Sequence, residues 1–318
     1  MTITYLLLAS SLLHAKVVSH EARLEAIRRA QIAQPVDVAA MDLLAGPQGE
    51  GSYPPGAEIR CRYEERDPKR PIGGHSKKFP CVDSSGTRLK VKYGAENTEV
   101  RGEVAGTRLF WALGFFAERM YPVKIVCENC PEDPFVSDKT PRATRVFEPA
   151  TVQKRLKGEE ISEVEDEGWR FSELDLAPDQ AQADALKLLA ALVNHGDNTA
   201  NQQRLLRLPN GDVIMYVTDL GGTFGGRSHY TNLKHWSRKA SLWKDKAACR
   251  LDFSGTDSSY RDPVISEAGR AFLAERLSKL SNKQLKDLFT AARLTPVDEW
   301  VKEFDRKRAE IVTTRCPK

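Results

Sequence analysis

Hydrophobic and polar positions alternate over several short segments in the first half of the chain, and this alternation predicts β-strands. Segment 87–93 is the clearest, because its apolar side chains share one face of the strand while Lys90 and Lys92 share the other. Weaker patterns predict further strands over 57–63, 121–127 and 142–147. The first half of the chain is therefore expected to be rich in β-structure.

One stretch within this half has a helical period instead. Its apolar side chains recur every three or four positions, and Asn97 or Thr98 stands where an N-cap is expected. Glu99 and Glu103 are four residues apart, so they lie on one face of the helix. Gly114 supplies the left-handed residue with which many helices end. We therefore expect a single helix that carries two carboxylates on one side.

The second half of the chain is predicted to be mostly helical. Helical periods cover 177–193 and 266–280, a capping box at Ser281 opens another helix, and a last helix starts at Thr295. One β-hairpin interrupts this half, over 203–218, and the sequence Pro-Asn-Gly-Asp forms its turn. The chain thus combines a β-rich half with a helical half, which is an α+β fold.

An aspartate stands just outside each end of this hairpin. The polar loop before it contains His195 and Asp197, and the strand after the turn runs into Asp219, which is followed by Leu-Gly-Gly. A hairpin brings its two ends together, so the two carboxylates can be held close in space. Such a pair can position a hydroxyl and a metal-bound phosphate for in-line transfer.

The pattern of Gly, Pro and apolar residues divides the chain into four segments. Residues 1–15 form an apolar segment that is too short to span a bilayer and ends in small residues, as signal peptides do. Residues 16–56 are predicted to form a helix and a linker rich in Gly and Pro. A β-rich unit is expected over 57–148 and a mostly helical unit over 149–318, with Glu148-Pro149 as the hinge between them.

The overall composition is that of an ordinary folded protein. The chain has 318 residues, of which 41% are hydrophobic and 29% charged, and this excludes a largely disordered chain. Its net charge of +4 is spread along the sequence without a basic block, so we expect no nucleic-acid partner. No stretch after the N-terminal segment suits a transmembrane span, and oligomeric state cannot be deduced from the sequence.

The N-terminal segment predicts export, to a periplasm or to the cell exterior, with a mature chain that begins near Lys16. No Lys or Arg precedes the apolar residues, so a cytoplasmic protein with a buried N-terminal helix is the alternative. Six cysteines form an even set, which suits an oxidising compartment. Cys127 and Cys130 form a CxxC motif without a second pair of metal ligands, so disulfides are favoured over a zinc site. The pairing of the cysteines stays open.

A glycine-bearing loop with two lysines precedes the lysine strand. It contains Gly73 and Gly74, and Lys78 follows shortly after them. Backbone N–H groups freed by glycine, together with a nearby cation, can hold phosphates. The loop is therefore a candidate phosphate-binding element, although paired glycines more commonly form simple turns.

Residues 70–225 carry a resemblance to known proteins. The motifs LKVKYG, EVAGTRLFWALGF followed by YPV, HGD and VTDLGG occur in an order and spacing that resemble the atypical branches of the protein-kinase-like fold. These branches are the HipA-like kinases, the phosphatidylinositol kinases and the secretory-pathway casein kinases. The resemblance implies a bilobal fold, with a β-rich N-lobe and a mostly helical C-lobe.

The resemblance also implies a role for each matching residue. Lys92 would bind the nucleotide phosphates, with Lys90 as the alternative, and Glu103 would pair with it, with Glu99 as second choice. Asp197 would orient or deprotonate the acceptor hydroxyl, with His195 beside it in the same loop, and Asp219 would hold the metal. The phosphate-covering loop would consist of Gly73, Gly74 and Lys78. The implied cofactors are ATP and Mg²⁺ or Mn²⁺, and the implied activity is transfer of the γ-phosphate to a hydroxyl.

One position departs from the pattern of these kinases. Five residues after the catalytic aspartate, protein kinases have a metal-binding Asn, whereas this chain has Gln202, with Asn201 one residue earlier. This leaves three alternatives open: a pseudokinase-like nucleotide-binding module, transfer of AMP from a reversed nucleotide, and an unrelated exported interaction domain. The acceptor also stays open among protein, lipid, sugar and small molecule.

Overall fold

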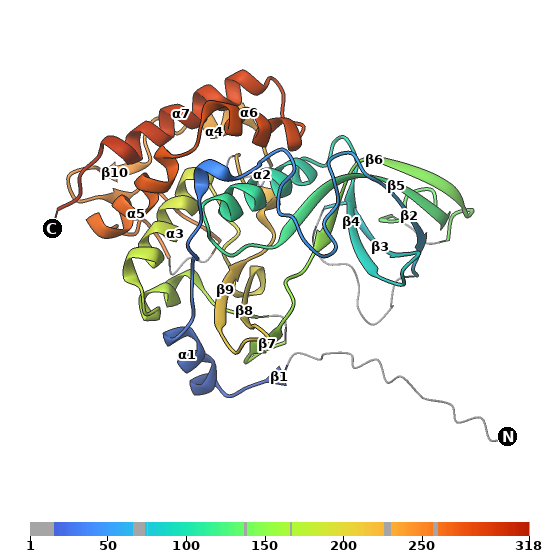
Figure 1. Ribbon diagram of the computed structural model, residues 1–318, viewed down its shortest axis with the longest axis horizontal. Helices are drawn as coiled ribbons and strands as arrows, with labels where there is room; N and C mark the ends of the chain where they lie inside the picture. The colour runs from blue at the N-terminus through green and yellow to red at the C-terminus, as the bar shows by residue number, and fades with distance from the viewer. Residues whose placement is uncertain are drawn as a thin grey trace.

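The computed structural model describes residues 16–65, 74, 76–136, 139–165, 167–225, 230–256 and 260–317. Helices and strands both contribute, as the α+β prediction requires: a β-barrel lies toward one end of the molecule and most helices lie toward the other (Figure 1). The predicted signal peptide over 1–15 and the predicted loop residue Gly73 lie outside the described residues.

The barrel consists of five strands in the closed order β2-β3-β4-β6-β5. They are β2 (Glu58–Tyr63), β3 (Lys78–Asp83), β4 (Arg88–Tyr93), β5 (Arg119–Cys130) and β6 (Ala143–Lys154). Neighbouring strands are antiparallel except β2 and β5, which are parallel. The predicted strands are confirmed, and their alternating apolar side chains fill the barrel. The predicted hinge at Glu148-Pro149 is wrong, because β6 runs through it and the predicted boundary there would divide this strand.

Helix α2 (Glu99–Ala112) follows β4, as predicted. Gly114 has a left-handed backbone (φ 80°), and the Phe115 N–H donates to the Phe110 carbonyl at 2.9 Å, so the helix ends in the expected way. Its N-cap is Thr98, which makes no side-chain capping bond. The Asn97 side chain donates to the Tyr93 carbonyl instead, so it ties the start of the helix to the end of β4.

The helical half packs around α3 (Gln180–Val193), most of whose side chains are buried. Helix α5 (Glu267–Ser278) packs on α3 and on α7 (Val297–Thr313), and α6 (Asn282–Ala291) packs on α7 and α2. The capping box at Ser281 is present, which confirms the predicted start of α6.

A four-stranded sheet with the order β1-β7-β8-β9 lies beside these helices. Its strands are β1 (Lys16–Val17), β7 (Glu159–Ser162), β8 (Gln203–Arg207) and β9 (Val213–Val217). Strands β8 and β9 form the predicted hairpin. The remaining elements are α1 (His20–Arg28), α4 (Leu233–Ser237), β10 (Trp243–Asp245), β11 (Arg250–Leu251) and the short 3₁₀ helices η1 (Val38–Ala40), η2 (Phe171–Leu176), η3 (Ala200–Gln202) and η4 (Leu220–Gly222).

The segment between α1 and β2 is packed against the molecule, although its Gly and Pro content predicted a linker. It runs from the β8–β9 hairpin past the helices to the barrel (Figure 1). Side chains from three elements donate to its backbone carbonyls: Gln284 of α6, Arg108 of α2 and Tyr121 of β5. Because the segment bridges α6, α2 and β5, it helps to fix the position of α2.

Three disulfides join Cys61 to Cys81, Cys127 to Cys130, and Cys249 to Cys316. The first two lie in the barrel, and the third joins the residue before β11 to the segment that follows α7. The preference for disulfides over a zinc site at the CxxC motif therefore agrees with the structure. Over the described ranges, none of the helices combines the length and apolar character that crossing a bilayer requires.

Candidate functional site

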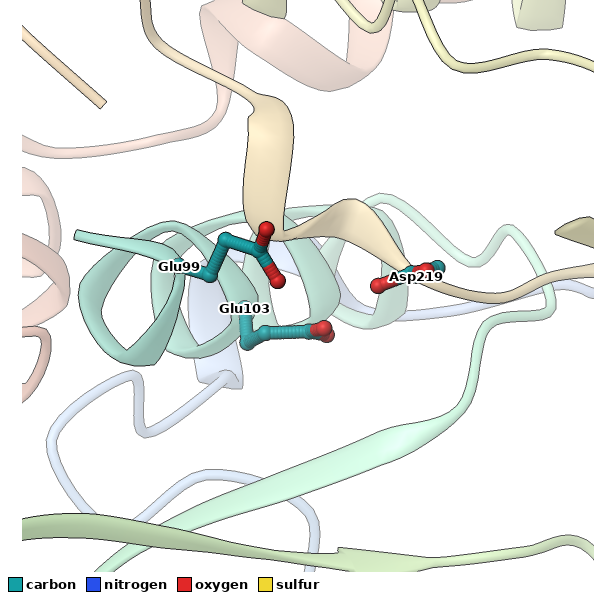
Figure 2. A group of neighbouring side chains, drawn as sticks. All are labelled: Glu99, Glu103 and Asp219. Carbon is teal, nitrogen blue, oxygen red and sulfur yellow. The ribbon is translucent and has the colours of Figure 1, made fainter. Parts of the chain in front are cut away.

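Lys92 lies at the centre of a buried charged cluster. It is on the face of β4 opposite the barrel interior, and its side chain is only 2% exposed. Its ammonium group donates to Glu103 of α2, to Glu99 Oε2 at 3.2 Å and to Asp219 Oδ1 at 2.8 Å. The structure thus brings together the predicted lysine, both candidate glutamates and the aspartate that follows β9. Figure 2 shows the three carboxylates converging from α2 and from the start of η4.

Glycines allow the Asp219 segment to lie directly on α2. A methyl group at Gly102 would overlap the carbonyl oxygen of Gly221, and one at Gly106 would come within 2.8 Å of the Leu220 Cβ atom. A methyl group at Gly221 would likewise meet the Glu99 Cβ atom at 2.8 Å. Only a glycine-lined contact of this kind permits so short a backbone separation. These glycines therefore place Asp219 beside the glutamates of α2.

Glu118 fixes the backbone of Asp219. Asp219 has a left-handed backbone (φ 53°), which a non-glycine residue adopts at a cost of order 1–3 kcal/mol. The buried Glu118 accepts a hydrogen bond from the Asp219 N–H at 2.8 Å, and its other carboxylate oxygen accepts one from Gln153. The sequence analysis missed Glu118, because nothing local in the sequence indicates that it reaches residue 219.

The cluster contains more negative than positive charge. The carboxylates of Glu99, Glu103 and Asp219 lie within 4.8 Å of one another around the single ammonium group of Lys92. Burial disfavours the charge of Asp219, but the Lys92 ammonium, a hydrogen bond with Glu103 and the charge of Lys90 together outweigh it and hold the pKa of Asp219 well below its usual range. Burial raises the pKa of Glu103, and its carboxyl group bonds to Asp219. Burial also disfavours the charge of Lys92, but the surrounding carboxylates raise its pKa overall.

The donor atoms of this cluster suit a hard divalent cation. All are carboxylate oxygens, the ligands that Mg²⁺ and Mn²⁺ prefer. Glu103 Oε2 is buried, and no described residue donates a hydrogen bond to it. An excess of buried carboxylate with an unsatisfied oxygen is costly without a further cation or proton. The residues present therefore fit the metal that the sequence predicts.

The second candidate aspartate, Asp197, lies in the loop between α3 and η3. Its carboxylate accepts hydrogen bonds from Gln202 Nε2 at 3.3 Å and from the Thr256 hydroxyl at 3.4 Å. The Gln202 carbonyl in turn accepts from the N–H and hydroxyl groups of Thr218, the residue before Asp219. Gln202 thus connects the two aspartates through a short chain of contacts.

Gln202 and Asn201 are placed differently with respect to Asp219. Gln202 and Asp219 line the same small cavity, whereas the Asn201 side chain points to its own loop and accepts from the Thr199 hydroxyl. Of the two amides that the sequence offered, Gln202 is therefore the better placed to share a ligand with Asp219.

His195, a candidate catalytic residue beside Asp197 in the same loop, lies in the core. Its side chain is fully buried, and its ring lies 6.1 Å from the ring of Phe171. A fully buried ring cannot reach an acceptor in solvent. Its position favours a packing role at the end of α3.

Two further predicted lysines lie beside Lys92 on the same face of the barrel. Lys78 is paired with Lys92 across β3 and β4, is half-buried, and lies close to Gly74, as the predicted phosphate loop requires. Burial lowers the pKa of Lys78, and Lys90 and Lys92 lower it further. Lys90 is exposed and lines the cavity next to Asp219.

Comparisons with known proteins include two distant structural neighbours. No protein-family model matches the sequence, and no curated protein matches it. A proinflammatory kinase of Helicobacter pylori, CtkA, aligns with 81% of this chain and 96% of its own, with a TM-score of 0.46 and 9% identity. HipA of Shewanella oneidensis MR-1, solved with HipB and operator DNA, aligns with 86% of this chain and 76% of its own, with a TM-score of 0.37 and 11% identity.

The first neighbour is a kinase and the second is a HipA protein, and the sequence motifs resemble proteins of these two kinds. The likenesses are distant, so the function rests on the geometry of the site itself.

Proposed function

We propose that this protein is an ATP-dependent phosphotransferase of the atypical kinase type, which uses Mg²⁺ or Mn²⁺ and a hydroxyl-bearing acceptor. One observation carries the proposal: the buried Lys92 contacts both the buried Glu103 and the partly buried Asp219, and the three residues come from three separate parts of the chain. Burying these charges is costly, and hydrophobic residues of similar size would often be at least as stabilising. A chemical role explains why the chain keeps them.

The proposed division of labour follows the positions of the side chains. Asp219, whose carboxylate lies beside those of Glu99 and Glu103 and also lines the cavity with Gln202, would hold the metal together with Gln202, and the bound metal would neutralise charge on the phosphates. Lys92, which Glu103 holds in place, fixes the Asp219 carboxylate through an ion pair. Asp197 orients the acceptor hydroxyl and accepts its proton, because its hydrogen bonds from Gln202 and Thr256 are long, at 3.3 and 3.4 Å, and can be exchanged for bonds to a substrate.

The same proposal gives the barrel and the helical half the roles of two lobes, with the nucleotide between them. The γ-phosphate is transferred if the nucleotide lies as it does in protein kinases. Which phosphorus reacts therefore depends on the direction in which the nucleotide lies.

A nucleotide-binding module without transfer activity is the second candidate. Lys92 is almost completely covered by its three carboxylate partners, so as it stands it does not face a phosphate. Gln202 also replaces the shorter Asn of protein kinases. Both features favour binding over catalysis.

Two measurements separate these candidates. Thermal unfolding with ATP and Mg²⁺ or Mn²⁺ tests binding, because a ligand of the native state raises the unfolding midpoint. Incubation with labelled ATP and no added acceptor tests transfer, with autolabelling as the first readout. We expect both a metal-dependent midpoint increase and label incorporation. A midpoint increase without label would favour the binding module, and no increase with any metal would contradict both candidates.

Export is part of the proposal. The three cysteine pairs at disulfide distance suit an oxidising compartment, and the apolar N-terminal segment suits a signal peptide. N-terminal sequencing of protein from its native host should find a start near Lys16. A retained Met1 would instead favour the cytoplasmic alternative.

Nucleic acid stays outside the expected partners, and filter binding at low salt tests whether the protein binds it.

A further inference from the structure

Glu99 is the one carboxylate of the charged cluster that the proposed function leaves without a task. It lies in the first turn of α2 and accepts from the Lys92 ammonium at 3.2 Å, the longest of the three contacts that Lys92 makes. Its side chain is 23% exposed and that of Asp219 is 29% exposed, whereas the side chain of Glu103 is only 1% exposed. A cation that approaches from solvent therefore meets Glu99 and Asp219 first.

A glycine lets the Glu99 side chain lie directly against the segment that carries Asp219. A methyl group at Gly221, two residues after Asp219, would lie 2.8 Å from the Glu99 Cβ atom and 3.0 Å from its Cγ atom. Contacts this short would force the Glu99 side chain or η4 to move. The absence of a side chain at Gly221 thus allows the Glu99 carboxylate to lie near that of Asp219, as Figure 2 shows.

The buried carboxylate of Glu103 offers a third oxygen to the same place. Lys92 donates to Glu103 Oε1, whereas no described residue donates to the buried Glu103 Oε2. Figure 2 shows this carboxylate extended toward Asp219. Two ionised carboxylates have no hydrogen to donate to each other, so the buried oxygen requires a shared proton or a cation. Glu103 can therefore bind a cation through Oε2 while Oε1 stays bonded to Lys92.

The charges of these side chains favour a divalent cation. Of the described residues, only Lys92 forms an ion pair with any of the three carboxylates. Three negative charges and one positive charge leave the ionised cluster with a net charge of −2. Buried or partly buried charges are costly unless opposite charge compensates them. One Mg²⁺ or Mn²⁺ ion would neutralise the cluster.

The spacing of the oxygens also suits such an ion. One oxygen from each of Glu99, Glu103 and Asp219 lies within 4.8 Å of the other two. Mg²⁺ binds oxygen at about 2.0–2.1 Å, so ligands on opposite sides of the ion lie roughly 4 Å apart. The three oxygens therefore need to approach one another by less than about 1 Å to share one ion.

From the exposure, contacts and charge of these side chains, we propose that Glu99 is a ligand of the divalent cation, with Asp219 and Glu103 Oε2, and that these three residues bind the cation without a nucleotide. The inference rests on the proposed function and completes the set of side chains that hold its metal. Asp219 links the three carboxylates to Gln202, because both residues line the same cavity.

The assignment also gives Lys92 a way to bind a phosphate. Its ammonium group donates to all three carboxylates, which cover it almost completely. When Glu99 and Asp219 bind the cation, their bonds to Lys92 are replaced, and the bond to Glu103 Oε1 remains. The ammonium group then has N–H groups that can donate to a phosphate.

Titration of the full chain with Mn²⁺ alone tests the inference without any contribution from phosphates. Electron paramagnetic resonance measures the free ion, whose signal falls as the protein binds it. Wild type should bind Mn²⁺ in the absence of nucleotide, and Mg²⁺ should compete. Glu99→Gln keeps the size of the side chain but removes its charge. Its Kd for Mn²⁺ should therefore rise by about tenfold or more, which corresponds to roughly 1.4 kcal/mol.

Two further variants make the result specific to Glu99. Glu96→Gln is the matched control, because Glu96 is an exposed carboxylate three residues earlier in the chain, and this variant should bind Mn²⁺ like wild type. Asp219→Asn is the reference for loss of the site and should weaken Mn²⁺ binding as well. The unfolding midpoint of each variant without metal shows whether it is folded.

The outcomes separate the inference from the proposed function. Equal Mn²⁺ binding by wild type and Glu99→Gln, with a loss in Asp219→Asn, would overturn the inference and leave the metal assignment of Asp219 in place. That result together with tighter ATP binding by Glu99→Gln would show that Glu99 only covers Lys92. Undiminished binding in both variants would contradict both assignments. No Mn²⁺ binding by wild type would overturn the inference alone, since stabilisation by ATP with metal tests the proposed function separately.

Discussion

The two ends of the β8–β9 hairpin carry one aspartate each, and the structure holds them in opposite ways. Asp219 is fixed by an ion pair to Lys92, by a backbone hydrogen bond to Glu118 and by the glycine contact with α2. Asp197 is held by two side-chain hydrogen bonds at 3.3 and 3.4 Å. The same hairpin thus ends in one group whose position is set before a substrate arrives and one whose position a substrate can still change.

This difference matches the two tasks that the proposed reaction requires. A metal ligand must be preorganised, because its charge stabilises the reacting phosphates only if it does not have to move. A group that handles the acceptor has to exchange its partners for those of the substrate. The contrast therefore predicts large structural effects for changes around Asp219 and small ones for changes around Asp197.

Lys92→Met should cause the largest loss of stability. It leaves the buried carboxylates of the cluster without their cation, which typically costs about 3–5 kcal/mol. Chemical denaturation measures the change. The matched control is Lys90→Met, on the same face of the same strand but exposed, which should stay within about 0.5 kcal/mol of wild type. Similar values for the two variants would show that the cluster does not stabilise the fold.

Gly102→Ala should have the next largest effect. Its methyl group would overlap the carbonyl oxygen of Gly221 and push η4 away from α2, which typically costs about 1–3 kcal/mol. The variant should also lose the stabilisation by ATP and metal, because Asp219 moves with η4. Gly196→Ala in the Asp197 loop is the control, since a methyl group there meets no atom within 4 Å. If both variants bind nucleotide like wild type, the glycine contact does not position Asp219.

Glu103→Gln should change how stability depends on pH. Burial raises the pKa of Glu103, so the native state keeps a proton that the unfolded chain releases above about pH 4.3. The stability that this group contributes is therefore present below that pH and falls as the pH rises toward the native-state pKa. Glutamine does not titrate, so the unfolding midpoint of the variant should fall less between about pH 5 and pH 8 than that of wild type.

The control for this prediction is Glu96→Gln, which removes an exposed carboxylate just before α2. Its midpoint should follow the wild-type dependence on pH. If the midpoint of Glu103→Gln also follows the wild-type dependence on pH, the pKa of Glu103 is the same in the native state and in the unfolded chain.

Asp197→Ala should have the smallest structural effect. The hydrogen bonds from Gln202 and Thr256 that it removes are long, so stability should change by no more than about 1 kcal/mol and nucleotide binding should persist. Transfer to the acceptor should nevertheless fall by about 100-fold or more, as is typical when a general base is removed. Undiminished transfer would exclude Asp197 from the reaction.

The sequence allowed prediction of the parts of the site that local patterns determine. Alternation along 87–93 placed Lys92 opposite the barrel interior, helical spacing placed Glu99 and Glu103 together, and turn residues defined the hairpin that ends at Asp219. Each of these features depends on neighbours only a few residues away. The two-lobed division and the roles of these residues stay predictions.

The features that the sequence did not reveal depend on distant contacts. In the sequence, Gly102 is an ordinary helix residue, and its importance depends on the close approach of Gly221. Glu118 matters because it accepts a hydrogen bond from the backbone N–H of Asp219, which is about a hundred residues away in the chain. The segment before the barrel is held by hydrogen bonds to its backbone carbonyl groups. Every residue has such a group, so the pattern of side chains could not predict that this segment is packed against the molecule. His195 shows that residue type alone does not define a role, because a histidine, which is suited to catalysis, is fully buried in the core.

The claim that Asp219 holds the metal that carries the nucleotide is tested most directly by thermal unfolding of Asp219→Asn with ATP, with and without Mn²⁺. The control is Asp212→Asn, in the exposed turn at the far end of the same hairpin. At 100 times its Kd, a ligand stabilises the native state by about 2.7 kcal/mol. Wild type and Asp212→Asn should show a metal-dependent increase in the unfolding midpoint, and Asp219→Asn should show none. An undiminished increase in Asp219→Asn would contradict the account.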